Sequence, residues 1–311
     1  MSLTLNEVIT DVAQKAGIDT QNQVNMNNLI RWVNLTQDTV CQAYPWDFLH
    51  ERTVLTSVVD TTGTAVTDVA DCTLASTTVT GTGTAFAATD VGRYIQFSSS
   101  NDWYKITARA STTSITIETG YAMATETAMT YTVRTFSYDL PTNMARIIDI
   151  RQFRTPAKLV PVDTRTFDSF QPLSSSTGNP RAYYVYSYNN SQSLTGQNYA
   201  VSFYPVPSLA MLFDVRYIRR PPQLSVGTDI SVIPQIFANV LITGTLVHVY
   251  QWMNSPNTGG QKKQFEQEIK EMLNKMPPTE DMSHVLQACD SASSPSQVVP
   301  FPSQYGYPYS Y

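Results

Sequence analysis

The chain has 311 residues, of which 42% are hydrophobic and 14% are charged, and its formal net charge is −5. This length is enough for one large domain or for two to three smaller ones with cores of their own. An acidic chain without a run of Lys or Arg is not expected to grip nucleic acid or an anionic membrane electrostatically. The low charge and the many Thr, Ser, Tyr and Asn residues predict a β-rich protein whose surface carries neutral polar groups or partners.

Two helices are predicted at the start of the chain, over residues 4–16 and 25–44. The first opens with the capping-box pattern Thr4-Leu-Asn-Glu7, continues with apolar residues at three- and four-residue spacing, and meets a natural stop at Gly17. Pro45 ends the second helix. The apolar stripe of the second helix consists of Met26, Leu29, Ile30, Val33, Val40, Cys41 and Tyr44.

From Glu51 to Tyr217 the hydrophobic period changes to two, which is typical of strands. Strands are predicted over 52–58, 130–138, 146–153, 181–188, 199–204 and 212–219, with a short helical turn over 163–170. The polar loop 189–198 is expected to join two of these strands as a hairpin. Residues 59–129 separate the first two strands, and we interpret them as a small β-domain inserted into a hairpin of the surrounding domain.

The sequence Gly81-Thr-Gly83 inside this block raises the question of a phosphate-binding loop. Such a loop needs a helix N-terminus that faces the phosphates, and a third Gly or a Lys-Ser/Thr at the right spacing. Here no Lys follows, and a strand-like stretch, Arg93 to Phe97, comes soon after. The two glycines are therefore predicted to form a turn between short strands. Further along, Ile115 and Ile117 are expected to share one face of a strand.

Tyrosines are concentrated in the predicted hairpin over residues 181–204. The five are Tyr183, Tyr184, Tyr186, Tyr188 and Tyr199. Two interpretations are open. The rings could pack across strands as amphipathic side chains, or they could form an interface with a partner.

Two more helices are predicted over 234–254 and 261–275, separated by Gly259-Gly260. The stripe of the first consists of Ile236, Phe237, Val240, Leu241, Gly244, Val247, His248 and Gln251. The inner side of the second consists of Phe265, Ile269, Met272, Leu273 and Met276. Residues 277–311 begin with two prolines and are rich in Pro, Ser and Tyr. They are predicted to form an extended arm whose aromatic side chains dock along a partner.

No catalytic, cofactor or metal site is predicted. Neither a zinc site nor a disulfide framework is indicated by the three widely separated cysteines, Cys41, Cys72 and Cys289. No hydrolase triad or zinc motif surrounds any of the histidines, His50, His248 and His284. We interpret His248, on an apolar helix face, as a packing residue.

Two charged pairs leave alternatives open. Glu280-Asp281 could belong to the carboxylate pair of a glycosidase, although the low density of charge argues against it. Arg219-Arg220 is the strongest local positive charge, and it could contact DNA backbone or a partner's carboxylate, or simply be a solvated strand end. The N-terminus lacks the regions of a signal peptide, and the most apolar helix, about 240–253, is too short to span a bilayer. These features predict a soluble protein made in a reducing cytosol.

The predicted fold class is α+β. A bundle of N- and C-terminal helices is expected to pack on an antiparallel β domain, with a small inserted β-domain and an extended C-terminal arm. The corresponding division places the main domain at 1–58 and 130–276, the inserted β-domain at 59–129 and the arm at 277–311.

Four short motifs follow one another along the chain. They are Tyr44-Pro-Trp-Asp-Phe-Leu49, then Tyr138-Asp-Leu-Pro141 with Arg146-Ile-Ile-Asp-Ile150, then Val201-Ser-Phe-Tyr-Pro-Val-Pro207, and finally Tyr217-Ile-Arg-Arg-Pro-Pro-Gln-Leu224. With the order of the elements they resemble the head–tail adaptor proteins of tailed bacteriophages, particularly the tail tubular protein A group of short-tailed phages. The resemblance covers the main domain. The inserted block departs from the compact members of that group and is similar to small β-modules of phage structural proteins.

The resemblance implies a non-enzymatic virion protein, made in the host cytoplasm and located at the head–tail junction. Such a protein would form a ring of twelve subunits that contacts the portal protein and the downstream nozzle protein, with tail fibres as a further partner. DNA would pass through the ring without sequence-specific binding. The arm would reach the portal through Phe301, Tyr305, Tyr307, Tyr309 and Tyr311.

Two other functions remain as alternatives. A β-rich tail-fibre attachment or glycan-binding module would use residues 59–129 as its working part. A hydrolase acting on surface glycans would use Glu280 and Asp281.

Overall fold

In the computed structural model, residues 3–63, 68–153, 158–169, 176–188 and 198–276 are described. Contacts divide the chain into two units, one formed by Met1–Phe48 with Gln223–Tyr311 and the other by Leu49–Pro222. The first contains helices and the second contains antiparallel sheets, so the predicted α+β class is confirmed.

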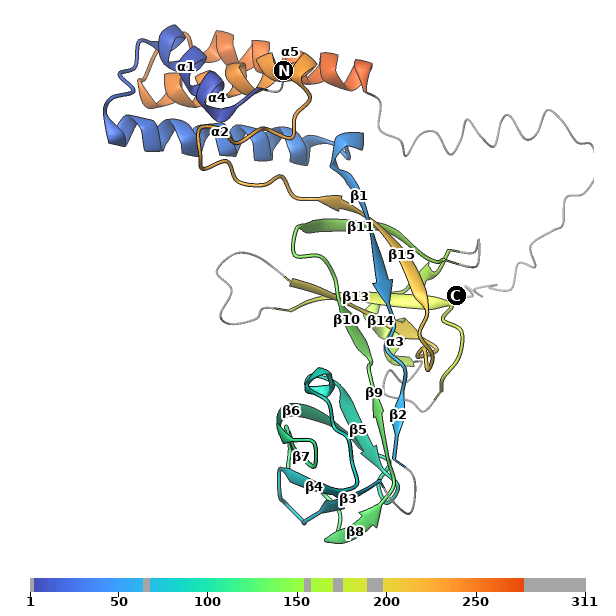
Figure 1. Ribbon diagram of the computed structural model, residues 1–311. Helices are drawn as coiled ribbons and strands as arrows, with labels where there is room; N and C mark the ends of the chain where they lie inside the picture. The colour runs from blue at the N-terminus through green and yellow to red at the C-terminus, as the bar shows by residue number, and fades with distance from the viewer. Residues whose placement is uncertain (1–2, 64–67, 154–157, 170–175, 189–197, 277–311) are drawn as a thin grey trace, which may run out of the picture. The chain divides into compact units, whose positions relative to one another are not determined.

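The helical unit contains four long helices that lie side by side (Figure 1). They are α1 (Leu5–Ala16), α2 (Gln23–Ala43), α4 (Ala238–Trp252) and α5 (Thr258–Lys275), with a short 3-10 turn, η3 (Gln235–Phe237), before α4. A second 3-10 turn, η1 (Asp47–Leu49), spans the boundary between the two units in the chain. At the start of α1 the amide N–H groups of Thr4 and Glu7 are each capped by the other's side chain, as the capping-box pattern predicts. Gly17 ends this helix in the left-handed conformation, with φ of 68°.

Helix α4 differs from the amphipathic helix expected from its sequence. It contacts α1, α2 and α5, and it is buried on nearly all sides, including the polar Thr243 and Thr245. A helix buried all round has no distinct polar face. The predicted stripe was wrong at Ile236 and Gln251, which are exposed.

Helix α5 begins three residues before the predicted start and includes Gly259 and Gly260 in its first turn. The turn that separates α4 from α5 lies instead at Asn254, which has φ of 50°. Propensity is a weak guide to helix ends, so two glycines do not by themselves mark the end of a helix.

The segment from Gln223 to Ile233 is fixed to the first two helices by polar contacts. The Asn34 side chain accepts from the Leu224 backbone N–H and donates to the Leu224 carbonyl, each at 2.8 Å. The Ser231 hydroxyl donates to Gln37 Oε1 at 2.8 Å. The Leu5 amide donates to the Asp229 carbonyl at 2.8 Å. Buried amide and hydroxyl groups therefore set the path by which the chain enters α4.

In the second unit, two sheets share a core, and all their strand pairs are antiparallel except one at the edge of the four-stranded sheet. The three-stranded sheet has the order β1 (His50–Thr56), β15 (Leu212–Arg219), β11 (Met144–Gln152). The four-stranded sheet has the order β10 (Ser137–Asp139), β14 (Asn198–Tyr204), β13 (Ala182–Tyr188), β12 (Val160–Pro161), and the short helix α3 (Thr164–Ser169) contacts β13. Phe203 and Phe213, one from each sheet, stack with ring centroids 4.4 Å apart.

The tyrosines of β13 alternate between two environments. Tyr183 is buried in the shared core, opposite Phe203. Tyr184 and Tyr186 stack on each other at 5.9 Å, and Tyr184 also contacts Phe167 of α3 at 5.5 Å. These contacts support cross-strand and local packing for these three rings.

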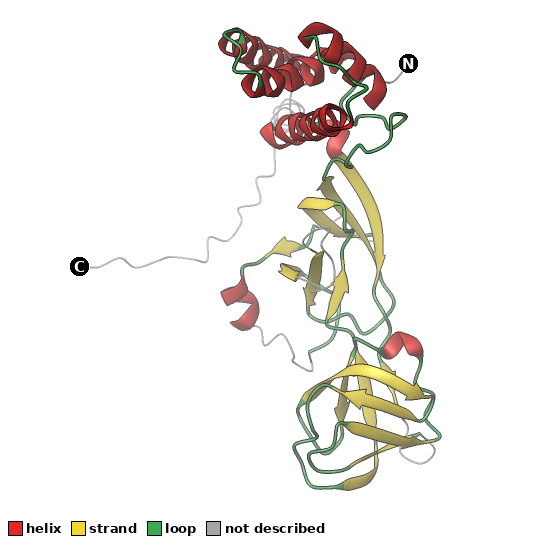
Figure 2. Cartoon of the chain, turned by 90° about the vertical axis from the view of Figure 1, so that its left-hand side faces the viewer, coloured by secondary structure: helices red, strands yellow, loops and turns green. Residues whose placement is uncertain are grey.

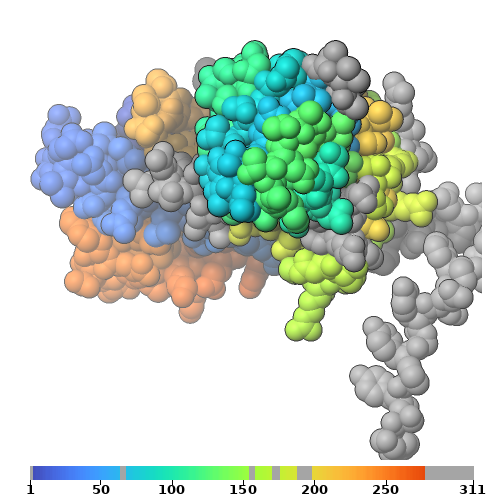
Figure 3. Space-filling view, turned by 90° about the horizontal axis from the view of Figure 1, so that it is seen from below, coloured from blue at the N-terminus to red at the C-terminus, as the bar shows by residue number. Residues whose placement is uncertain are grey.

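A third sheet of eight strands occupies residues 61–134. Its order is β2 (Thr61–Thr62), β9 (Tyr131–Arg134), β5 (Tyr94–Phe97), β6 (Trp103–Ser111), β7 (Ser114–Ile117), β4 (Thr78–Thr82), β3 (Val69–Cys72), β8 (Glu126–Met129), with the 3-10 turn η2 at Ala88–Asp90. Figure 2 shows the strands curling around a shared interior, and Figure 3 shows the cyan and green segments interleaved in one packed body. Ile115 and Ile117 lie together in its core, as predicted.

The strand expected over 130–138 is two strands in two different sheets, β9 and β10. The strand expected over 52–58 pairs with β15, so these two segments do not form the hairpin predicted around the insert. The division falls at Thr135-Phe136, where Phe136 packs between Trp103 and Tyr94 at 5.0 and 5.3 Å. Periodicity of two does not distinguish one long strand from two short ones that share its phase.

Gly81 and Gly83 have different roles. Gly81 lies within β4 opposite Ala70, so it is a strand residue and the turn predicted there was wrong. A Cβ at Gly81 would lie 2.3 Å from Thr84 Cγ2, which explains the absence of a side chain. Gly83 has φ of 73° and makes the turn.

Candidate functional site

The outer face of the three-stranded sheet carries a pattern of charge repeated on two strands. β11 contains Asp149 and Arg151 at a spacing of two, and β15 contains Asp214 and Arg216 at the same spacing. The strands are antiparallel, and the register places Asp149 opposite Arg216 and Arg151 opposite Asp214. Each carboxylate therefore faces a guanidinium across the ladder.

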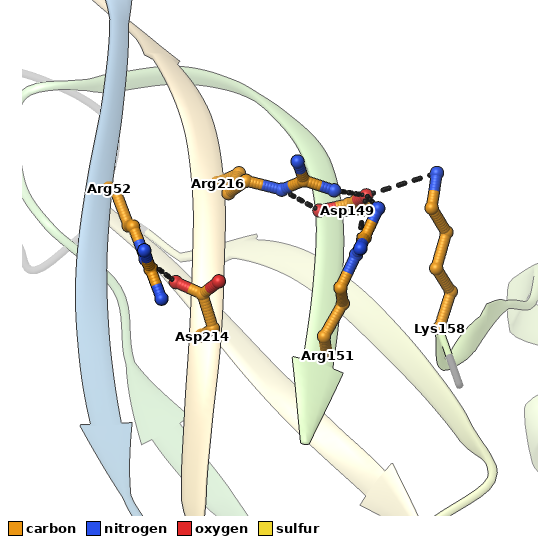
Figure 4. A network of polar contacts seen from close by, with 6 residues as sticks. All are labelled: Arg52, Asp149, Arg151, Lys158, Asp214 and Arg216. Carbon is orange, nitrogen blue, oxygen red and sulfur yellow. Dashed lines mark hydrogen bonds and ion pairs between the residues drawn. The ribbon is translucent and has the colours of Figure 1, made fainter. Parts of the chain in front are cut away.

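These residues, with Arg52 and Lys158, form a charged network of two clusters, one around each carboxylate (Figure 4). Asp149 accepts from Arg216 Nε at 2.6 Å and forms ion pairs with Arg151 at 3.3 Å and Lys158 at 3.2 Å. Asp214 forms an ion pair with Arg52 of β1. Together the two clusters connect all three strands, and Lys158 joins β11 through Asp149.

The carboxylates lie beneath their cations. The side chains of Asp149 and Asp214 are 7% and 12% exposed, whereas those of Arg52 and Lys158 are both 60% exposed. Burial alone would raise the pKa of Asp149, but hydrogen bonds from Arg216 and Lys158 and the charges of Arg216 and Arg151 outweigh it, so its pKa is lowered. The same contact raises the pKa of Arg216. Asp149 is therefore ionised at neutral pH and saturated with donors, which suits cross-linking of strands and not proton transfer.

We expect the Asp149→Asn variant to lose about 1–2 kcal/mol of unfolding free energy at pH 7, since a charged hydrogen-bond acceptor is replaced by a neutral one. A lowered folded-state pKa gives stability that is present above the unfolded pKa of about 3.9 and is lost as pH falls through the folded value. The difference between wild type and variant should therefore shrink below about pH 4. Urea unfolding at pH 7, 5, 4 and 3 measures this difference in unfolding free energy. Asp11→Asn, at an exposed position of α1, is the control. A constant difference at every pH would contradict the role of this carboxylate.

The two arginines predicted as a contact site, Arg219 and Arg220, are half-buried at the end of β15. Arg219 lies opposite Met144 in the ladder. The Arg220 backbone N–H donates to the Asn143 carbonyl at 2.6 Å, and its guanidinium lies 5.9 Å from the ring of Tyr199 on β14. Arg220 thus helps to join the two sheets. The contact with DNA or a partner that the sequence suggested for these arginines stays a prediction.

The other sequence candidates fall into two groups. Phe301, Tyr305, Tyr307, Tyr309 and Tyr311 of the arm, together with Glu280, Asp281, His284 and Cys289, lie outside the described residues. His248 is half-buried on α4, and its pKa is lowered by burial. Within the described ranges, no group of three His, Cys, Asp or Glu side chains could hold a metal ion, and no helix is both long and apolar enough to cross a membrane.

The charged network was missed by the sequence reasoning, although a signal for it exists. The pattern Asp-x-Arg occurs in both the strand predicted at 146–153 and the strand predicted at 212–219. Two such patterns match each other when the strands pair antiparallel. Pairing of strands so distant in sequence could not be deduced from either pattern alone.

The chain is a helical unit joined to a unit of sheets. One sheet face combines arginines with exposed apolar side chains, which is a composition suited to binding other proteins. Residues 89–292, well over half of the chain, match the SU10 adaptor protein family, and the chain belongs to that family. No curated protein matches the chain. Membership makes it a bacteriophage head–tail adaptor and a component of the virion, in agreement with the broader resemblance to head–tail adaptors seen in the sequence.

Proposed function

We propose that the protein forms a ring of twelve subunits between the portal and the tail, through which DNA passes. The observation that supports this is the match of residues 89–292 to a family of phage adaptors. Its partners would be the portal protein, the downstream nozzle protein and, through the eight-stranded sheet, neighbouring subunits or tail fibres. Its architecture would be that of the tail tubular protein A group, and its role would be structural, without catalysis.

The charge of the chain is consistent with a DNA conduit. A net charge of −5 repels DNA weakly, so DNA would pass without adhering to the wall. Subunits in a closed ring make head-to-tail contacts, which cover a large part of each subunit's surface. A surface so poor in charge is suited to that coverage.

We also propose that three parts of the chain have different roles. Residues 1–58 and 130–276 would form the adaptor core, residues 59–129 an inserted β-domain, and residues 277–311 an arm that docks on the portal. The arm would insert Phe301, Tyr305, Tyr307, Tyr309 and Tyr311 into apolar pockets, since aromatic side chains bury much area at little entropic cost.

Electron microscopy of the protein mixed with the portal protein of the same phage tests the ring directly. We expect a ring coaxial with the portal. A protein that stays monomeric and ignores the portal would contradict the proposed function.

Deletion of residues 286–311 is expected to abolish portal docking and to leave the fold intact, because the deleted segment contributes to no described element. Co-sedimentation with the portal measures docking, and thermal unfolding measures the fold. A full-length variant with the five aromatic residues changed to serine separates side-chain contacts from arm length. Docking of the truncated protein at wild-type affinity would show that the arm is not the docking element.

A further inference from the structure

The strand register defines which side chains cover the outer face of the three-stranded sheet. Phe213, Val215 and Tyr217 of β15 point into the shared core, so the alternate residues of β15 and their partners point outward. The outward rows are Thr56 with Leu212 and Phe153, then Val54 with Asp214 and Arg151, then Arg52 with Arg216 and Asp149. We call these nine residues, with Lys158, the sheet outer face.

This face combines cations with exposed apolar side chains. Phe153, Val54 and Leu212 are 54%, 50% and 46% exposed, and the Arg52 guanidinium lies 5.7 Å from the Phe153 ring. The apolar row continues into a groove of about 390 Å³ lined by Gln152, Phe153, Leu209, Ala210, Met211 and Leu212. Arginine and aromatic residues beside a groove are typical of protein interfaces.

The face also has the opposite sign of charge to the chain as a whole. It contains four cationic side chains, Arg52, Arg151, Lys158 and Arg216, against two carboxylates. The chain has a net charge of −5, so the residues outside this face carry a larger negative total than the chain as a whole. A second copy therefore offers negative charge that complements this face.

We propose that the sheet outer face binds the acidic surface of a second copy of this chain, as one half of the head-to-tail contact between neighbouring subunits. This inference rests on the proposed ring, which needs two different surfaces of each subunit to meet. DNA is a poorer occupant, because phosphates give no apolar surroundings to Phe153, Val54 and Leu212.

Photo-crosslinking in the ring assembled on portal tests the inference. Leu212 is replaced by the photoreactive amino acid benzoylphenylalanine, and Leu35 of α2, which is as exposed as Leu212 at 46%, is replaced in the same way as the matched control. We expect position 212 to crosslink to a second copy, at a site rich in Asp and Glu, and position 35 to give less of that product. Adding Lys158→Glu should reduce the crosslink from position 212 at least fivefold, because it reverses an exposed charge of the face. Circular dichroism checks that the variant keeps its fold.

The outcomes separate this inference from the proposed function. A ring in which position 212 crosslinks only to portal, to a tail protein or to nothing overturns the inference and leaves the proposed function standing. An adaptor that forms no ring overturns both. A crosslink between copies that Lys158→Glu does not weaken contradicts the electrostatic basis of the contact.

Discussion

Replacement of Arg93 by alanine is expected to lower the unfolding free energy of the eight-stranded sheet by about 3–5 kcal/mol, because it leaves a buried charge without its partner. Arg93 is buried and forms an ion pair with the buried Asp90 at 2.8 Å. It also donates to the carbonyl oxygens of Val59 and Val133, at 2.8 and 3.0 Å, and to the Thr135 hydroxyl at 3.0 Å. One guanidinium thus holds the segments that enter and leave the sheet.

Hydrogen exchange of peptides from β2 to β9 measures the loss locally, and urea unfolding measures it for the whole protein. Arg109→Ala on β6 is the matched control, since its guanidinium donates to the Phe86 carbonyl from a half-buried position, and we expect a loss of about 1 kcal/mol there. The double variant Asp90→Asn with Arg93→Met should recover part of the stability, because no unpaired charge remains buried. A loss below about 1 kcal/mol for Arg93→Ala would show that this guanidinium does not hold together the segments that enter and leave the sheet.

Local sequence signals predicted local structure well. The capping box at Thr4 and the stop at Gly17 each depend on residues within one turn of each other, and both occur in the structure. The strand at 212–219 and the hairpin of β13 and β14 were also predicted, because turn and strand signals there lie within a short stretch. Nearby residues meet at low entropic cost, so their pattern is sufficient.

Features that depend on distant partners could not be predicted in this way. β1 pairs with β15 across about 160 positions of the chain, as the contact of Arg52 with Asp214 illustrates. The burial of α4 follows from contacts with three other helices, which its own period does not encode. The candidate site has the same origin, because its charges come from three strands that are separate in sequence.

The arginines illustrate the limit most clearly. The sequence singled out Arg219-Arg220 because the two charges are adjacent, yet Arg220 is occupied with Asn143 and Tyr199. Arg93, just before β5, and Arg216 of β15 have no neighbouring cation in the sequence, yet each forms an ion pair with a buried carboxylate. Adjacency along the chain places successive strand residues on opposite faces, so it is a poor guide to a charged surface in a sheet.

Substitution of Gly244 by alanine is expected to destabilise the helical unit by about 2–3 kcal/mol, although the same change stabilises most helix interiors by roughly 0.5–1 kcal/mol. A Cβ at this position of α4 would lie 2.4 Å from Thr36 Cγ2 and 2.6 Å from Phe265 Cε2. The missing side chain is what lets α2 and α5 approach the central helix from two sides. Chemical denaturation followed by far-ultraviolet circular dichroism measures the loss.

The chain provides a control of opposite sign. A Cβ at Gly260, in the first turn of α5, meets nothing within 4 Å, so Gly260→Ala should be neutral or stabilising by up to about 1 kcal/mol. Thr36→Ser removes the nearer clashing methyl and keeps the hydroxyl that accepts from Thr245 at 3.5 Å, so it should restore part of the stability of Gly244→Ala. If Gly244→Ala were as stable as wild type, or if Thr36→Ser added its own cost without relief, close packing at Gly244 would not be what sets the spacing of these helices.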